Sequence, residues 1–128
     1  MATNVKPIID HQIASNDDSV LVASWSTLTA SGDLGLPICL AAWSDKTVVV
    51  TGDFTGSPTI IIEGSNDGTN FVQISNRQGT AMSFTAAGLN TSQDRPVFVR
   101  PRLTAGAGGG NVVVSIACHR TDLAGMGR

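Results

Sequence analysis

The chain is 128 residues long, which fits one domain, and we do not expect a second independent core. Asp, Glu, Lys and Arg make up only 14% of it, against about 25% in an average soluble domain, so we expect partners to cover part of its surface. The formal net charge is −2 and no run of Lys or Arg occurs, which argues against direct binding of DNA or RNA.

The first 19 residues have the character of an N-terminal arm. They are polar and mixed, and their one short apolar cluster is Pro7, Ile8 and Ile9. A segment with so little apolar content does not fold alone but can order on a neighbour, so we expect these three residues to bind a partner. A frayed terminus is the open alternative. No secretory signal or membrane span is apparent, so we expect synthesis in a cytoplasm and no membrane partner.

Residues 20–120 show the rhythm of a β-domain. Short runs rich in Val, Ile, Thr, Phe and Trp alternate with Gly, Asn, Asp, Ser and Pro about every 8 to 12 residues. This pattern predicts a single all-β domain, an antiparallel, jelly-roll-like β-sandwich of about eight strands, followed by a C-terminal tail over 121–128. We expect strands at 20–30, 36–42, 46–54, 58–64, 70–75, 81–85, 96–104 and 111–119.

Two β-prone runs flank Asn66, Asp67 and Gly68, and this arrangement predicts a tight hairpin. Asp-Gly supplies the positive φ angles that such a turn needs. The same residues offer side-chain oxygens around a glycine, as a calcium loop does. They lack the alternating acids and the closing glutamate of an EF-hand, so we expect turn chemistry and no metal.

Alternation along the last two strands assigns their faces. We expect one face of the first to carry Val97, Val99, Pro101 and Leu103, the other to carry Phe98, Arg100, Arg102 and Thr104, and one face of the second to carry Val112, Val114, Ile116 and Cys118. The glycine-rich stretch over 105–111 predicts a flexible, exposed loop between them.

Pro101 cannot donate a ladder hydrogen bond, so its strand should lie at a sheet edge or be bulged there. The positive charges of Arg100 and Arg102 then either protect that edge from aggregation or dock a neighbouring subunit. We take both arginines as candidate partner-binding residues.

The sequence offers little for catalysis. His11 and His119 are the only histidines, Glu63 is the only glutamate, and no catalytic or phosphate-binding motif occurs, so we expect no enzyme, no cofactor and no metal site. Strand alternation sends Cys118 and His119 to opposite faces, which favours an outward-facing histidine over a shared metal site. Cys39 and Cys118 each lie in an apolar stretch and are expected to be buried, free thiols.

Trp25 and Trp43 have the surface to stack on sugar rings, which would make the domain a glycan-binding sandwich. Sugar sites usually cluster several aromatic rings, whereas aromatic residues make up only 5% of this chain. Both tryptophans lie beside apolar strand residues, so we expect them to pack in the core or in an interface.

Three stretches, over 62–72, 95–106 and 110–116, resemble small structural proteins of tailed bacteriophages, and the resemblance extends over about residues 46–120. Within that group the chain most resembles capsid decoration, or cement, proteins. The resemblance implies a β-sandwich that binds the outside of the phage head, clamps neighbouring subunits of the major capsid protein and acts as a dimer or trimer. It also implies synthesis in the host cytoplasm, a place in the virion and no catalytic residues.

Two alternatives stay open. The chain could be another virion component, such as a head-fibre base or a tail subunit, in which case it would be present in fewer copies than a decoration protein. It could instead be the glycan-binding module described above, in which case replacing Trp25 or Trp43 would abolish sugar binding.

Overall fold

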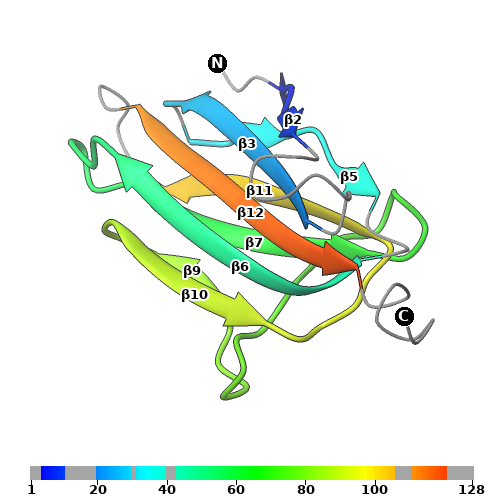
Figure 1. The fold of residues 1–128 in the computed structure, drawn as a ribbon. Coiled ribbons are helices and arrows are strands. Elements are labelled where there is room, and N and C mark those ends of the chain that lie inside the picture. Colours follow the sequence, from blue (N-terminus) through cyan, green and yellow to red (C-terminus); the bar gives the residue numbers. More distant parts are fainter. Residues whose placement is uncertain (1–3, 11–19, 30, 40–42, 106–110, 121–128) are drawn as a thin grey trace.

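The computed structural model describes residues 4–10, 20–29, 31–39, 43–105 and 111–120. Every regular element in these residues is a β-strand, and the strands form a five-stranded and a seven-stranded sheet that pack face to face (Figure 1). The predicted all-β sandwich is confirmed. The C-terminal tail over 121–128 and most of the glycine-rich loop, over 106–110, lie outside the described residues.

The five-stranded sheet is antiparallel throughout. In spatial order its strands are β10 (Gly88–Ser92), β6 (Trp43–Gly52), β12 (Val112–Arg120), β3 (Val20–Leu28) and β2 (Ile8–Asp10). The strand β12, near the end of the chain, therefore lies between two strands from its first half. This order depends on pairings between distant segments.

The seven-stranded sheet has β11 (Phe98–Ala105) at its centre, and this strand pairs with β7 (Thr59–Ser65) on one side and with β4 (Leu34–Gly35) and β5 (Ile38–Cys39) on the other. Its strands are β1 (Asn4–Val5), β4 (Leu34–Gly35), β5 (Ile38–Cys39), β7 (Thr59–Ser65), β8 (Val72–Gln73), β9 (Ser83–Phe84) and β11 (Phe98–Ala105). The short strands β4 and β5 share one position beside β11, and β8 and β9 share one beside β7. This sheet therefore has four strand positions, which are β4 with β5, β11, β7, and β8 with β9. With β3, β6, β10 and β12 of the other sheet, they make up the eight strand positions of a jelly roll.

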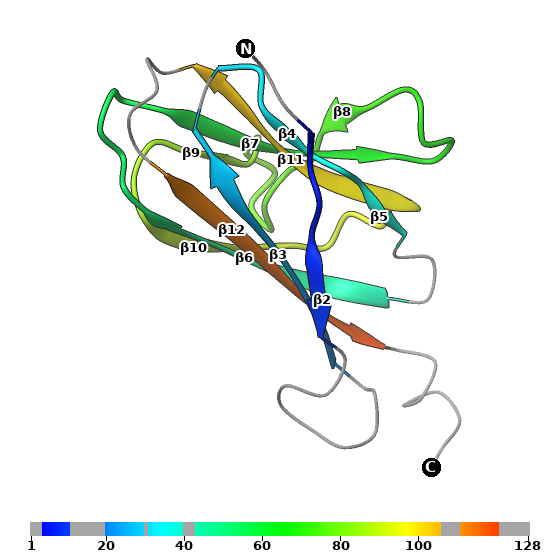
Figure 2. The ribbon, with the colours of Figure 1, turned by 90° about the horizontal axis from the view of Figure 1, so that it is seen from above.

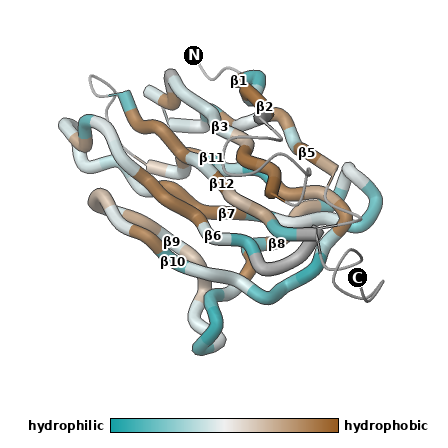
Figure 3. The backbone as a smooth tube through the Cα atoms, in the orientation of Figure 1, coloured by the Kyte–Doolittle hydropathy of each residue, from teal (hydrophilic) through white to brown (hydrophobic). Residues whose placement is uncertain are grey.

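The core lies between the sheets and follows the predicted alternation. The side chains of β12 that were assigned to one face, from Val112 to Cys118, are all fully buried, and so are those of Val99, Pro101 and Leu103 on β11. Both sheets contribute hydrophobic residues to this core, and the backbone tube is brown at segments of both sheets (Figure 3). The assignment of β12 is confirmed, and so is that of β11 except for Val97, which precedes the strand and is only partly buried.

The prediction that the strand of Pro101 lies at an edge or is bulged there is wrong. β11 is central, and its register shifts between Leu103 and Ala105 instead. It is the neighbouring strand that is interrupted, because Arg102 pairs with Leu34 and Val99 with Ile38, so that Pro101 faces the gap between β4 and β5. The central strand tolerates this proline because the neighbouring strand is interrupted opposite it, so no ladder hydrogen bond from its missing N–H is needed there.

The close approach at this gap also explains Gly35. A Cβ atom there would lie 2.5 Å from the ring of Trp25 and 2.7 Å from Cδ of Pro101. These distances are far below van der Waals contact, so only glycine lets the chain pass between the tryptophan and the proline.

The hairpin between β7 and β8 is confirmed, with Glu63 paired to Gln73 and Gly64 to Val72. Its turn is wider than the tight one predicted, because the pairing stops at Gly64. Gly68 has φ +77°, whereas Asp67 does not adopt a positive φ. The Asp67 side chain instead organises the loop as a hydrogen-bond acceptor.

Two features were missed. β10 has weak local strand signals, with Gly88 and Asn90 in a short polar run, and it forms because it pairs along β6. Residues 4–10, within the predicted arm, carry β1, which pairs with β4, and β2, which pairs with β3. This segment therefore runs from the edge of one sheet to the edge of the other (Figure 2).

The cysteines are both free, but only one matches the prediction. Cys118 is fully buried, and burial raises the pKa of its thiol to about 12. Cys39 is exposed, so its predicted burial is wrong, because Ile38 takes the inward position of β5. His119 is exposed beside buried Cys118, which confirms that the two residues face opposite sides.

Candidate functional site

Across the positions whose side chains the structure describes, the outer face of the five-stranded sheet carries no Asp, Glu, Lys or Arg, although the register places Asp10 opposite Val22 at its β2 edge. Because Leu21, Ala23, Val48, Val50, Val114 and Ile116 point into the core, the alternate positions point outward. We call these outward positions the uncharged face: Ile8, Val20, Val22, Ser24, Thr47, Val49, Thr51, Leu89, Thr91, Val113, Ser115 and Ala117. An antiparallel sheet with one solvated face normally alternates apolar with polar residues, and this face departs from that rule.

One row of the uncharged face crosses all five strands. The strand registers place Leu89 opposite Val49, Val49 opposite Ser115, Ser115 opposite Ser24, and Ser24 opposite Ile8. The two ends of the row are its most exposed members, with Leu89 at 65% and Ile8 at 72%. At about 4.8 Å between strands, the row is about 19 Å long.

The predicted contact residues Pro7, Ile8 and Ile9 lie at one edge of this face. Ile8 belongs to the uncharged face, while Ile9 pairs with Ala23 and is partly exposed. Pro7 is half-buried. Their role in binding a partner stays a prediction, and the structure adds that they adjoin a larger surface with the same character.

The other predicted contact residues, Arg100 and Arg102, lie on the opposite side of the molecule, on the outer face of the seven-stranded sheet. Arg100 donates from Nε to Oε1 of Glu63 at 2.9 Å, and Nη1 of Arg102 lies 3.7 Å from Oε2 of the same carboxylate. The guanidinium of Arg100 also stacks 3.8 Å from the ring centroid of Phe71. Glu63, at 5% exposure, needs these partners because a buried, unpaired carboxylate is costly.

Sequence reasoning did not connect Glu63 with the arginines. The pairing follows from the register of β11 against β7, in which Arg100 lies directly opposite Glu63. Charges of opposite sign on two β-runs were the available signal, but the register that makes them neighbours is not readable from either run alone.

A second missed residue is Lys46, whose side chain is fully buried in the first half of β6. Its Nζ donates to the carbonyl oxygen of Asp94. Ser92 donates from Oγ to the carbonyl of Ser75 at 2.7 Å, and the N–H of Ser75 donates to Oδ2 of Asp94 at 2.8 Å. These bonds attach the segments around residues 75 and 94 to the end of the sandwich, so we assign Lys46 a structural role.

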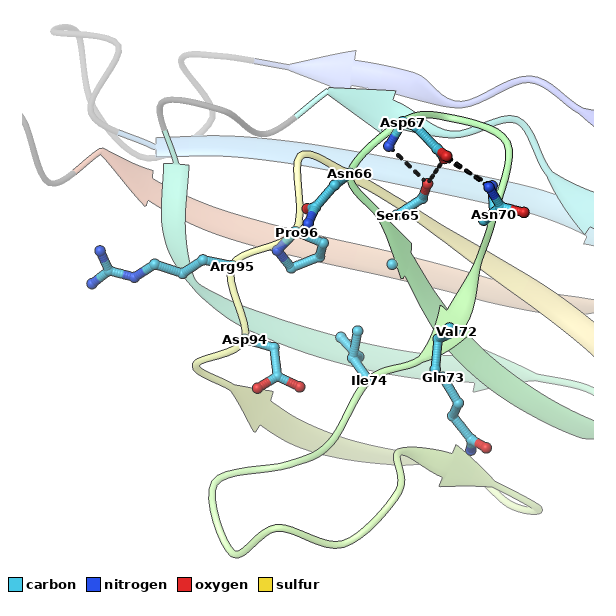
Figure 4. Close-up of a pocket in the computed structure, with 11 residues that line it drawn as sticks. Ser65, Asn66, Asp67, Asn70, Val72, Gln73, Ile74, Asp94, Arg95 and Pro96 are labelled. Carbon is cyan, nitrogen blue, oxygen red and sulfur yellow. Dashed lines mark hydrogen bonds between the residues drawn. The ribbon is translucent and has the colours of Figure 1, made fainter.

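A pocket of about 590 Å³ opens between the β7–β8 loop and the segment that leads into β11 (Figure 4). Its lining residues are Gly64, Ser65, Asn66, Asp67, Asn70, Val72, Gln73, Ile74, Asp94, Arg95 and Pro96. Among the described residues that line this pocket there is no aromatic ring.

The Asp67 carboxylate at the rim of this pocket is already occupied. It accepts hydrogen bonds from the N–H groups of Asn70 and Thr69, each at 2.8 Å, from the Asn70 amide at 2.7 Å and from the Ser65 hydroxyl at 2.8 Å. These bonds, that from the Asn70 N–H first, hold the pKa of Asp67 well below its ordinary value. Turn chemistry therefore accounts for this loop, as the sequence predicted.

Within the described residues, no group of three or more His, Cys, Asp or Glu side chains lies close enough to hold a metal ion. The same part of the chain contains no helix long and apolar enough to cross a membrane. Trp25 is fully buried and donates from Nε1 to the carbonyl of Leu36 at 3.0 Å, so its predicted core packing is confirmed. The side chain of Trp43 lies outside the described part of the structure.

Comparison with known proteins yields structural likeness only. Neither a model of a known protein family nor a characterised protein sequence matches the chain. Among solved structures, the chain is similar to the SPBc2 prophage-derived protein YomS, with a TM-score of 0.58 and 14% identity over 77% of this chain and 94% of YomS. What the two proteins share is a fold.

Two further solved structures show weaker likeness. One is the cupin domain of Schizosaccharomyces pombe Cnp3, with a TM-score of 0.46 and 9% identity over 91% of this chain and 63% of that one. The other is a recombinant oxalate oxidase in complex with glycolate, with a TM-score of 0.47 and 12% identity over 89% of this chain. The chain spans only 51% of that oxidase.

These comparisons contradict the prediction that the protein is not an enzyme, because oxalate oxidases are among the structures that it matches. That prediction rested on missing sequence motifs, whereas a fold can assemble a catalytic site from residues that are distant in the sequence. We withdraw it. At TM-scores of 0.45 to 0.47, these likenesses carry no catalytic residue, cofactor or substrate over to this chain.

Proposed function

We propose that the protein is a phage virion component, and specifically a capsid decoration protein that binds the outside of a tailed-phage head and stabilises contacts between major capsid protein subunits. The observation that carries the proposal is the uncharged face. Its exposed ends, Leu89 and Ile8, keep apolar surface in water that a docked partner would cover. The fold shared with a prophage-derived protein and the resemblance to phage structural proteins support a phage origin.

The size of the uncharged face bears on how such binding would work. Five strands by at most three outward positions measure about 19 by 14 Å, or about 260 Å². A stable interface buries about 800 Å² on each partner, so one face alone binds weakly. We therefore propose that the protein binds as a dimer or trimer, in which several modest contacts act together and add the predicted contacts of the N-terminal arm.

The stabilising effect would follow from mass action. A ligand that binds the assembled shell and not its separated subunits lowers the free energy of the shell by an amount that grows with ligand concentration. A protein that spans a joint between capsid subunits also adds buried area that outward pressure must separate. Neither effect needs a catalytic group.

The test uses heads of the encoding phage that were purified without this protein. We expect the added wild-type protein to saturate at a fixed number of copies per head and to raise the temperature at which heads disrupt. Leu89→Lys, which places a charge on the uncharged face, should weaken binding at least tenfold. Val72→Lys is the matched control, because Val72 is similarly exposed, at 73%, but lies on the seven-stranded sheet.

Two outcomes would contradict the proposal. Wild-type protein that fails to bind heads, or native heads that lack it in stoichiometric amounts, would remove the decoration function. Counting copies per particle separates the remaining virion roles, since a head-fibre base or tail subunit is present in few copies or only on the tail.

A further inference from the structure

A second pocket, of about 450 Å³, lies at one end of the uncharged face. It is lined by Thr47, Arg77, Thr91, Gln93 and His119. Thr47 and Thr91 are direct cross-strand neighbours on β6 and β10. His119 comes from the end of β12, while Arg77 and Gln93 come from the segments beside β10. We call this site the corner pocket.

The lining of the corner pocket favours an anion. It offers a guanidinium, an imidazole, two hydroxyls and an amide, and among the described residues that line it none is acidic. Guanidinium, hydroxyl and amide N–H groups are the donors that bind carboxylates, and arginine does so with two parallel hydrogen bonds.

Arg77 differs from the arginines of the seven-stranded sheet in having an available side chain. Its backbone N–H donates to the carbonyl of Thr91 at 3.1 Å, which fixes its position beside β10. The turn that carries it is closed by Asn76, whose side chain accepts from the N–H groups of Gln78 and Thr80, each at 3.0 Å. Across the described residues, the Arg77 guanidinium has no carboxylate within ion-pair distance.

We propose that the corner pocket binds a carboxylate, the side chain of an aspartate or glutamate on the protein that docks against the uncharged face. This inference rests on the proposed function and adds the chemistry of the partner. An uncharged sheet face favours contact with a partner but does not determine the position at which the partner docks. One acidic group held by Arg77 at the end of the face fixes the register, because misaligned docking would leave both charges without a partner.

Docking would also strengthen the contact. In water an exposed arginine and a carboxylate attract each other weakly, and salt screens them further. A partner that covers the uncharged face removes water from the adjoining pocket and so lowers the local dielectric constant. The pocket therefore discriminates between partners mainly in the docked complex.

The first test compares two exposed arginines in the head-binding assay. Arg77→Gln should weaken binding by about 30-fold or more, because an interfacial acid loses its counter-charge. Arg77→Lys should keep the salt dependence of binding but recover only part of the affinity, since lysine lacks the planar fork. Arg95→Gln is the matched control, as Arg95 is an exposed arginine outside the corner pocket, and it should bind like the wild type. Equal binding by Arg77→Gln and Arg95→Gln would overturn the inference and leave the proposed function standing.

The second test uses the free protein, so it does not depend on heads. Sodium acetate added to ¹⁵N-labelled protein should shift the amide resonances of Thr47, Thr91 and His119, with sodium chloride at equal ionic strength as the control. Arg77→Gln should abolish these shifts. If acetate has no effect beyond that of chloride, the inference fails. If sodium glucuronate binds more than tenfold tighter than acetate, the pocket serves an acidic sugar and the proposed protein partner is wrong.

Discussion

The two outer faces of the sandwich differ in what they leave available to a partner. On the seven-stranded sheet, Glu63 pairs with Arg100 and Arg102, and Phe71 stacks on Arg100, so the charged groups are already engaged within the chain. On the five-stranded sheet, the described residues of the uncharged face form no such network, and its apolar ends at Ile8 and Leu89 are exposed. A partner therefore gains binding free energy more readily on the uncharged face than on the outer face of the seven-stranded sheet, where the charged groups are already paired.

This difference changes how the predicted contact residues are weighed. Arg100 and Arg102 remain candidates for partner binding, but an acid on a partner would have to compete with Glu63 for them. Ile8 needs no such exchange. Three substitutions test the comparison, and they follow in order of decreasing effect.

Glu63→Gln should have the largest effect. The substitution leaves the guanidinium of Arg100, which is mostly buried, without its carboxylate, and we expect the free energy of unfolding to fall by about 3 kcal/mol. Urea denaturation measures it. In the double variant with Arg100→Met, part of the loss should be recovered, because the mostly buried charge is removed and the remaining one, on Arg102, is 41% exposed to water. A loss below about 0.5 kcal/mol in Glu63→Gln would mean that the seven-stranded face does not depend on its ion pairs.

The two cysteines differ in burial, since Cys118 lies on the inner face of the five-stranded sheet and Cys39 on the outer face of the seven-stranded sheet. The folded pKa of Cys118, about 12, lies above the ordinary value of 9.0, so folding favours the protonated thiol. Its contribution to stability is therefore complete below pH 9 and is lost as the pH rises from 9 towards 12, by about 1.4 kcal/mol at pH 10. Denaturation of wild type and Cys118→Ala at pH 8 and pH 10 measures the difference.

A thiol reagent gives an independent check on the same pair. Cys39 is exposed and should react with the native protein, whereas Cys118 should react only after unfolding. Reaction of both thiols at equal rates in the native state would contradict the buried position of Cys118.

Leu89→Lys should have the smallest effect on the isolated chain. Leu89 is exposed, so the free energy of unfolding should change by no more than about 0.5 kcal/mol. The same substitution should reduce self-association at high concentration, measured by sedimentation, because a charge interrupts the row from Leu89 to Ile8. Val72→Lys serves as the control. If Val72→Lys reduced self-association equally, the uncharged face would have no special part in it.

Alternation along the chain was enough to predict the fold class and most of the long strands. The inward positions of β11 and β12, such as Val99 and Val114, were correctly assigned because side chains on a strand alternate strictly between two faces. The hairpin at Gly68 was predicted for a similar reason, since few residues besides glycine adopt its positive φ. These are local properties.

Only the tertiary structure decided which strands are neighbours and which distant residues are in contact. The central position of β11, the strand β10, the pairing of Glu63 with Arg100 and the meeting of Arg77 with His119 at one pocket all depend on segments that are distant in the sequence. Alternation says which side chains share a face of one strand but not which strand lies beside it. Register and strand order come from the packing of the whole core, so both candidate surfaces become visible only once the two sheets are assembled.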